Sequence, residues 1–445
     1  WCCHDPFPIP RPEVFLVTRR LLVILAAVAL LAGACTGDDD EGSPTGETPS
    51  GPVTLTFWHG YTDAEADSLN ALLDQWNAEN PDVSIEPLFV NNDKALQKLT
   101  VALQGGEPPD ITYQYGSSLP QLAAAPGLVD LTDWTQQPDV DWEDFVAGAR
   151  EAATFEEKVL GVPALIDNLA VVYNKELFDA AGLEYPNDQW TWDDFRAAAA
   201  ALTDPAEKRF GFSYPMDASE DSVWHYDPLL WQNGGSILTE DNSQAAFNSP
   251  EGVEALEVLT GMAVEDESVF LDLQNSPYTG LFNSGKIGML VTGPWDLSSF
   301  PDVDYGVEIL PGFDGDHQTI AGPDMWTVFD NGGGRAQAAL DFIAWLTAAD
   351  QMKADALATG HLPFRLSVIE DAAFVEEFGA TIPGVDVFAE NLANVEQARP
   401  VLAAYPQVSE AMGLAIVSAM LGEKDAQTAL DDAAAEANDA LALGG

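Results

Sequence analysis

A strand, a helix and a second strand follow one another in residues 53–89, VTLTFWHGYTDAEADSLNALLDQWNAENPDVSIEPLF. Residues 53–58 alternate between apolar and polar side chains shortly before a glycine, which is typical of a half-buried strand. Residues 63–79 carry leucines and a tryptophan at helical spacing, and Pro81 ends that helix. The next run, residues 83–89, predicts the second strand.

The same order continues downstream. Residues 92–104 place three leucines on one helical face, and residues 105–109 form a loop of glycine, proline and glutamate. Residues 110–113 then predict a third strand. Strands that alternate with helices are joined by right-handed crossovers in a parallel-type sheet, so the sequence predicts an α/β fold.

A second set of elements begins near residue 164. Residues 170–173 and 286–291 read as strands, and Thr191 opens a helix with an acid three residues later, as in a capping box. We expect further helices over residues 175–181, 250–264, 335–346, 372–378, 408–421 and 426–443. No internal repeat of fixed period is evident, so the second set is not a copy of the first.

Length and charge bound the class of protein. A chain of 445 residues is too long for one ordinary core, which predicts two domains or lobes. It carries 17 Lys+Arg against 73 Asp+Glu, a net charge of −56, and such a surface repels nucleic acid and anionic lipid. The acidic coat keeps an exported protein soluble, and the scarcity of lysine raises salt adaptation as a further hypothesis.

The N-terminal region resembles an export signal. Arg19 and Arg20 precede an apolar stretch, residues 21–31, which leads through small residues to Cys35. Fourteen residues from 21 to 34 are too few to span a bilayer comfortably. The pattern resembles a bacterial lipobox, which predicts cleavage before Cys35 and a diacylglyceryl group on its thiol. The alternative is a structural cysteine that follows an apolar helix.

Three further expectations concern this region. Nothing upstream of Val17 fits a targeting pattern, so translation is expected to start at Val17. Residues 36–52 are rich in Gly, Ser, Thr, Pro and acid and predict a flexible tether that spans about 23 Å. The only cysteines are Cys2, Cys3 and Cys35, so no disulfide framework, metal site or cofactor is expected in the 410 residues beyond.

Six short strings now match one family in order and spacing. They are FWHG (57–60), PDI (109–111), GVP (161–163), VYNKELF (172–178), FNSGKIGM (282–289) and GPW (293–295). The chain resembles the family 1 extracellular solute-binding proteins, a sugar-binding group. The resemblance runs from residue 53 to about residue 405 and follows the lipobox.

The resemblance implies a two-lobed periplasmic-binding-protein-like α/β fold of type II, with mixed sheets flanked by helices and a ligand cleft between the lobes. The chain would cross between lobes near residues 163–168, 285–295 and 321–334. The expected boundaries are residues 1–34 for an upstream extension and signal peptide, 35–52 for the lipidated cysteine and tether, 53–163 and 290–330 for lobe one, and 164–289 and 331–445 for lobe two. The lobes would close over ligand like a hinge.

Candidate ligand-binding residues follow from the chemistry of sugars. Sugar rings offer C–H faces to aromatic side chains and hydroxyls to carboxylates and amides. Trp295 follows a Gly-Pro turn that would project it into the cleft, whereas Trp58 and Trp231 are expected in the core. On position and resemblance the candidates are His59, Tyr61, Gln114, Tyr115, Asp167, Asn168, Trp224, Trp295, Asp296, Trp326 and Tyr405.

Two of these candidates match the family less closely. Trp326 falls in an expected hinge loop where Pro323 departs from the family's Gly-rich pattern, and Tyr405 matches a late aromatic only loosely. His59 could instead cap the core, and Gln114 with Tyr115 could form a solvated turn.

The function implied by the resemblance is that of the binding subunit of an ABC importer. It would capture a neutral mono- or oligosaccharide, act as a monomer, need no cofactor, and pass the sugar to a membrane permease. Cys35 would anchor it to the outer face of the cytoplasmic membrane. No His-Glu-x-x-His, Gly-x-Ser-x-Gly or P-loop motif is present. A secreted carbohydrate-active hydrolase and a surface scaffold lipoprotein are the alternatives.

Overall fold

The computed structural model describes residues 48–272 and 278–444. The expected signal peptide, Cys35 and most of the expected tether lie outside the described residues. Within the described ranges, no helix has both the length and the apolar character needed to cross a membrane.

The first sheet has five strands in the order β2-β1-β3-β12-β6. Their bounds are β1 (Val53–His59), β2 (Val83–Phe89), β3 (Ile111–Tyr115), β6 (Val162–Leu165) and β12 (Asp324–Val328). β1 runs parallel to β2 and β3, with α1 (Asp63–Glu79) and α2 (Asn92–Gly105) in the connections. The prediction of strand, helix, strand, helix and strand over residues 53–113 is confirmed, and antiparallel β12 between β3 and β6 makes the sheet mixed.

The second sheet also has five strands, in the order β11-β7-β10-β8-β9. Their bounds are β7 (Ala170–Asn174), β8 (Phe210–Pro215), β9 (Val269–Asp272), β10 (Ile287–Thr292) and β11 (Tyr305–Glu308). β10 is parallel to β8 and antiparallel to β7, so this sheet is mixed as well. Every residue of β10 is buried, as its uninterrupted apolar sequence requires in a central strand.

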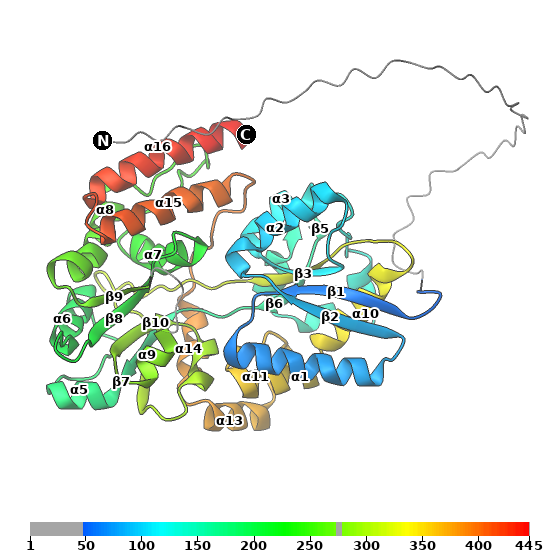
Figure 1. Cartoon of the computed structure of the whole chain (residues 1–445), viewed down its shortest axis with the longest axis horizontal. Helices are drawn as coiled ribbons and strands as arrows, with labels where there is room; N and C mark the ends of the chain where they lie inside the picture. Colours follow the sequence, from blue (N-terminus) through cyan, green and yellow to red (C-terminus); the bar gives the residue numbers. More distant parts are fainter. Residues whose placement is uncertain (1–47, 273–277, 445) are drawn as a thin grey trace, which may run out of the picture. The chain divides into compact units, whose positions relative to one another are not determined.

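Helices cover both sheets (Figure 1). On the second sheet, α15 (Tyr405–Met420) packs on α7 (Glu220–Gln232) and α16 (Ala426–Gly444), and α16 in turn packs on α8 (Pro250–Thr260). The remaining long helices are α6 (Trp192–Leu202), α10 (Arg335–Leu346), α11 (Ala349–Thr359) and α13 (Ala372–Thr381). The shorter ones are α3 (Leu119–Ala123), α4 (Ala147–Ala152), α5 (Lys175–Ala181), α9 (Tyr278–Asn283), α12 (Leu366–Ile369) and α14 (Val385–Asn391).

The strand pairing moves the lobe boundaries from those expected. β10 and β11 fall within residues 290–330 or just before them, yet both pair with β7 in the second sheet. In contrast, α10 and α11 follow residue 330 but contact β1 and α1 of the first lobe. We therefore place residues 324–359 in lobe one and β10 and β11 in lobe two, so no crossing occurs near residues 285–295. The chain crosses between the sheets at residues 166–169 and 309–323.

Asp110, in the Pro-Asp-Ile string, ties the first lobe together. Its carboxylate is fully buried and accepts hydrogen bonds from Arg335 Nε at 2.7 Å, Arg335 Nη2 at 2.5 Å and the Thr56 backbone N–H at 2.7 Å. Burial alone would raise the pKa of Asp110, but the hydrogen bonds from Arg335 and Asn331 hold it below its usual value. One carboxylate thus joins β1, β3 and α10.

Candidate functional site

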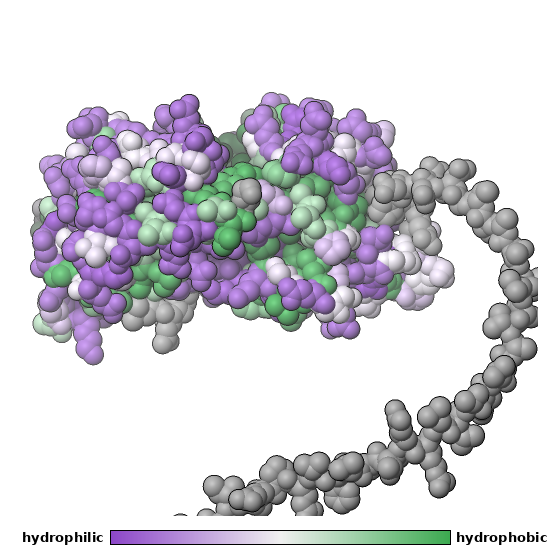
Figure 2. All heavy atoms as spheres, turned by 90° about the horizontal axis from the view of Figure 1, so that it is seen from above, coloured by the Kyte–Doolittle hydropathy of each residue, from purple (hydrophilic) through white to green (hydrophobic). Residues whose placement is uncertain are grey.

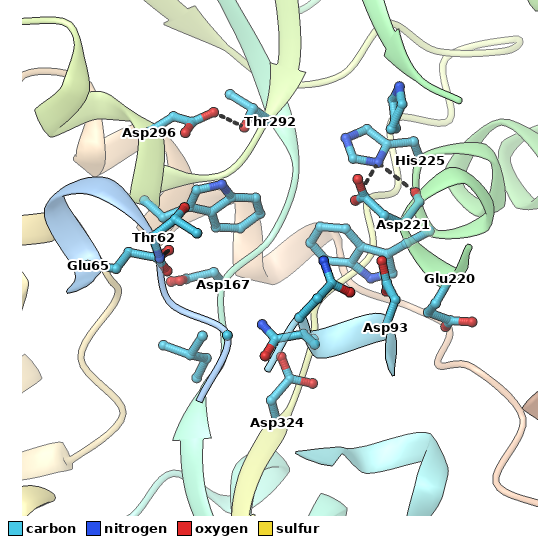
Figure 3. Close-up of a pocket in the computed structure, with 18 of the residues that line it drawn as sticks. Thr62, Glu65, Asp93, Asp167, Glu220, Asp221, His225, Thr292, Asp296 and Asp324 are labelled. Atoms are coloured by element: carbon cyan, nitrogen blue, oxygen red, sulfur yellow. Dashed lines mark hydrogen bonds and ion pairs between the residues drawn. The ribbon is translucent and has the colours of Figure 1, made fainter. Parts of the chain in front are cut away.

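A cleft of about 520 Å³ is lined by residues of both sheets and their loops. First-lobe residues come from the loop after β1, the start of α1 and α2, and β3; second-lobe residues come from β8, α7, β10 and the turn after β10. Figure 3 shows labelled side chains from both lobes that point into this space. The sequence predicted such a cleft only through its resemblance to the solute-binding family.

Two tryptophans of the second lobe form an aromatic surface in the cleft. Trp224 lies on α7 and Trp295 in the 3₁₀ turn Pro294–Ser299, and both are half-buried. Their ring centroids are 5.9 Å apart at an interplanar angle of 31°. The Trp295 ring lies directly over Gly293, where a Cβ atom would collide with it. The Gly-Pro-Trp string therefore fixes where this indole lies.

Asp296 follows Trp295 and is almost completely buried. Its Oδ2 accepts a hydrogen bond of 2.6 Å from the Thr292 hydroxyl. Burial raises the pKa of Asp296 to about 7, against the lowering effect of hydrogen bonds from Thr292 and Tyr278. Glu65 and Asp63 of α1 also raise this pKa, and all three carboxylates line the same cleft.

A second group of carboxylates in the cleft lining includes Asp93 of the first lobe and Asp221 of the second. Asp93, on α2, accepts a hydrogen bond of 2.9 Å from the Tyr115 hydroxyl. Burial, together with Asp221 and Asp217 of the second lobe, raises the pKa of Asp93 to about 7. Asp217 lies in the loop before α7 and Asp221 in the first turn of that helix, where the Ser219 hydroxyl caps the helix by accepting from the Asp221 backbone N–H.

Arg399 links the two lobes beside the cleft. Its Nη1 donates to Glu220 of the second lobe at 3.1 Å, and its Nη2 lies 3.6 Å from Asp324 of the first lobe. The guanidinium also lies 5.3 Å from the ring centroid of Tyr115. Asp324 Oδ2 accepts a hydrogen bond of 2.5 Å from Tyr113, whereas its buried Oδ1 accepts none. The charge of Asp324 Oδ1 is therefore balanced by the Arg399 ion pair and not by a hydrogen bond.

His225 supplies the other cationic group of the lining. Its Nδ1 lies 2.8 Å from the Asp221 backbone oxygen, and its Nε2 lies 3.1 Å from the Val291 backbone oxygen. Both ring nitrogens face acceptors, which requires the doubly protonated ring for two hydrogen bonds. Burial opposes this charge, but Asp221 raises the pKa of His225 above its usual value.

Five of the eleven expected site residues line the cleft. They are Tyr115, Asp167, Trp224, Trp295 and Asp296. Asp167 is already engaged on both oxygens, since Oδ1 accepts from the Leu362 backbone N–H at 2.8 Å and Oδ2 lies 2.5 Å from His361 Nδ1. Its position at the crossover between the sheets makes it a hinge contact as well as a lining residue.

The other six expected residues are buried outside this lining. Trp326 belongs to β12 instead of a hinge loop, and its ring packs 4.8 Å from that of Phe57. Tyr61 packs against Trp326 at 5.9 Å. Burial lowers the pKa of His59 to about 4, which keeps its ring neutral near physiological pH. These three aromatic rings belong to the core that supports the cleft.

Gln114, Asn168 and Tyr405 make internal hydrogen bonds. Gln114 donates to the Thr112 hydroxyl at 3.2 Å, and Tyr405 donates to Glu220 at 3.0 Å. Asn168 donates to the Phe388 backbone oxygen and accepts from Asn391, both at 2.9 Å. In these positions the three side chains hold the lobes and the crossover in place.

Sequence reasoning did not single out several lining residues. They are Thr62, Asp63, Glu65, Phe89, Asp93, Glu220, Asp221, Asp324 and Arg399. Most follow the carboxyl end of a parallel strand or open a helix, which is where open α/β sheets place their sites. The acidic residues of this set could not be distinguished by their charge in a sequence with 73 Asp+Glu. Within the described ranges, no group of three or more His, Cys, Asp or Glu side chains is placed to hold a metal ion.

The protein has two α/β lobes, each built on a mixed sheet, and crossover segments join them. A polar and aromatic cleft lies between the lobes, which is the arrangement of a two-lobed binding protein. Residues 62–353 match the family model described as bacterial extracellular solute-binding protein. The chain belongs to this family, and its members are solute-binding proteins, not enzymes.

Solved structures agree with this assignment. The ABC substrate-binding protein of Listeria monocytogenes in complex with cycloalternan is 26% identical with a TM-score of 0.79, over 88% of this chain and 99% of that one. The cyclic alpha-maltosyl-1,6-maltose binding protein of Arthrobacter globiformis is 32% identical with a TM-score of 0.69, over 88% of this chain and 100% of that one. A curated relative, the maltotriose-binding protein of Pyrococcus abyssi, is 24% identical over 74% of this chain and 70% of its own length. The chain is thus a solute-binding protein of the ABC transporter type for sugars or related ligands.

Proposed function

We propose that the protein captures a neutral mono- or oligosaccharide in the cleft and delivers it to the permease of an ABC importer. The observation that carries the proposal is the Trp224–Trp295 pair, which lies among carboxylates of both lobes. Indole faces take the C–H faces of sugar rings, and carboxylates accept hydrogen bonds from their hydroxyls. The named ligands of the three relatives above are all saccharides, which supports the same ligand class.

Charge favours a neutral ligand over a phosphorylated one. Among the described residues, eight carboxylates line the cleft: Asp63, Glu65, Asp93, Asp167, Glu220, Asp221, Asp296 and Asp324. The lining cations Arg399 and His225 are already bound to Glu220 and Asp221, respectively. An anionic ligand would therefore enter a negative field without a free cation to bind. Figure 2 shows hydrophilic residues over much of one face of the molecule, as the acidic composition leads us to expect.

The cellular arrangement completes the proposal. Lipidation at Cys35 would hold a monomer at the outer face of the cytoplasmic membrane and raise its effective concentration near the permease. Replacement of Cys35 by alanine should release the protein from the membrane fraction and abolish incorporation of labelled fatty acid. Retention of the label in the Cys35→Ala variant would contradict the anchor.

Isothermal titration calorimetry with neutral saccharides tests the binding function. We expect one-to-one binding that Trp295→Ala weakens by at least tenfold. Trp190→Ala is the matched control, because Trp190 is a half-buried tryptophan of the same lobe that does not line the cleft. Absence of binding to every saccharide by the folded protein would favour a non-sugar solute or a scaffold role.

A further inference from the structure

Seven of the polar residues that line the cleft fall into two clusters. We call Thr62, Glu65, Thr292 and Asp296 the Asp296 cluster, and Asp93, Glu220 and Asp221 the Asp93 cluster. Figure 3 shows the labelled residues of the Asp296 cluster on one side of the site and those of the Asp93 cluster on the other. Trp295 directly precedes Asp296, Trp224 lies one helical turn after Asp221, and their ring centroids are 5.9 Å apart, so the aromatic pair connects the two clusters.

Each cluster combines carboxylates from both lobes. In the first cluster, Glu65 and Asp63 of α1 raise the pKa of the buried Asp296 carboxyl of the second lobe. In the second cluster, Asp221 and Asp217 of the second lobe raise the pKa of the buried Asp93 carboxyl of α2. Carboxylates that face one another repel unless donors lie between them. Each cluster is therefore suited to hydrogen-bond donors on a ligand that touches both lobes.

An exposed aromatic residue also lines the cleft. Phe89 ends β2, four residues before Asp93, and lines the cleft although it is 53% exposed. Its ring packs edge-on against His59 at 6.4 Å. A large exposed apolar side chain at the rim of a cleft often marks a binding surface. Here it can cover the C–H face of an outer sugar ring.

From this arrangement, and resting on the proposed function, we propose that the ligand is an oligosaccharide of at least two rings. One ring hydrogen-bonds at the Asp296 cluster, another hydrogen-bonds at the Asp93 cluster, and Phe89 contacts the ring at the rim. A single ring on the tryptophan pair supplies hydroxyls to only one cluster. The other cluster would then be removed from water on closure without donors, which penalises a monosaccharide.

Calorimetry on the purified full-length protein tests this inference. The probes are glucose, galactose, mannose and xylose, each with its α- and β-linked di- and trisaccharides. We expect the best di- or trisaccharide to bind at least tenfold more tightly than its constituent monosaccharide. Asp296→Ala and Asp93→Ala should each weaken that oligosaccharide at least tenfold, and Phe89→Ala about threefold. The matched control is Asp74→Asn, an exposed acid of α1 outside the cleft lining.

The outcomes separate this inference from the proposed function. A monosaccharide that binds as tightly as its oligomers would overturn the inference and leave the saccharide function standing. Full affinity after loss of either Asp93 or Asp296 would overturn it equally. Absence of binding to every probe would overturn the saccharide function and the inference together. Thermal unfolding checks each variant, and Asp93→Asn and Asp296→Asn replace an alanine variant that does not fold.

Discussion

His361 Nδ1 donates a hydrogen bond of 2.5 Å to Asp167 Oδ2, so a histidine that follows α11 holds the segment that joins the two sheets. On its other side, His361 Nε2 lies 3.1 Å from Glu65 on α1. The imidazole is buried between two carboxylates. Burial alone would lower its pKa, but Asp167 and Glu65 raise the pKa well above its usual value. The hinge therefore contains a buried imidazolium.

We predict that His361→Gln lowers the free energy of unfolding by about 3 kcal/mol, because removal of one partner leaves a buried carboxylate without its cation. The pKa of His361 is raised in the folded state, so its contribution is complete below the unfolded pKa of about 6.5. The contribution is lost as pH rises through the folded pKa. Urea unfolding of wild type and variant from pH 5 to 10 measures the difference.

The histidine control for that experiment is His317→Gln. His317 is half-buried and its Nδ1 lies 2.8 Å from the Leu310 backbone oxygen, without a carboxylate partner in the structure's described ion pairs. We expect a smaller loss for His317→Gln, of about 1 kcal/mol. An equal and pH-independent loss in both variants would contradict the charged role of His361.

Asp93 should also lose a stabilising proton as pH rises, but over a lower pH range than His361. Its folded pKa of about 7 exceeds the unfolded value of about 3.9, so the folded state holds a proton that the unfolded state releases. The stability that this proton supplies is complete below pH 4 and is lost as pH rises to 7 and beyond. Asp93→Asn should therefore match wild type near pH 4 and exceed it by roughly 4 kcal/mol at pH 8, because each of the about 3 pKa units corresponds to about 1.4 kcal/mol. Thermal unfolding at both pH values measures this, and a stabilisation that is equal at both would disprove the assignment.

The sequence predicted the elements whose signals are local. Strands and helices in residues 53–115 follow from their own periodicity, and Trp295 follows from the Gly-Pro turn before it. The prediction that Trp326 lies in a hinge loop was wrong. Trp326 belongs to β12, which pairs with β3 about 200 residues earlier, and no local sequence pattern indicates that pairing. The prediction that the chain crosses between the lobes near residues 285–295 was wrong for the same reason, because β10 pairs with β7 and β8 in the second sheet.

The polar residues of the site could not be predicted because contacts between residues far apart in the sequence bring them together. Arg399 and Glu220 are 179 residues apart, and Arg399 and Asp324 meet from different lobes. Ser409 and Tyr405 of α15 also donate to Glu220. Nothing near Arg399 in the sequence distinguishes it from a surface arginine. Such clusters are defined by tertiary packing alone.

We expect Arg399→Met to be among the most destabilising substitutions near the cleft. The variant keeps much of the side-chain volume but leaves Glu220 and the poorly bonded Asp324 Oδ1 buried without a cation, at a cost of about 3–5 kcal/mol. Arg196→Met is the control, because Arg196 binds Asp266 and Glu265 in a more exposed setting. Its loss should be about 1 kcal/mol or less. Guanidinium unfolding of both variants checks the order, and a larger loss for Arg196→Met would contradict the linking role of Arg399.

Gly293 offers a test of the tryptophan surface that removes no aromatic ring. The residue has φ −102° and ψ 179°, which alanine adopts without backbone strain. An alanine Cβ would nevertheless collide with the Trp295 ring, so the indole must move from its place beside Trp224. Because sugar stacking depends on ring position, we expect Gly293→Ala to lower saccharide affinity about tenfold or more with a small change in melting temperature.

Gly105→Ala is the matched control, since a Cβ there meets nothing within 4 Å. Gly105 ends α2, so alanine should leave affinity unchanged and stability equal or slightly higher. Calorimetry and thermal unfolding of both variants separate the two effects. Full saccharide affinity in Gly293→Ala would show that the indole can shift without loss, and the stacking role assigned to Trp295 would then fail. Reduced affinity together with an unchanged melting temperature would instead place the effect on the position of the indole, because the fold itself remains intact.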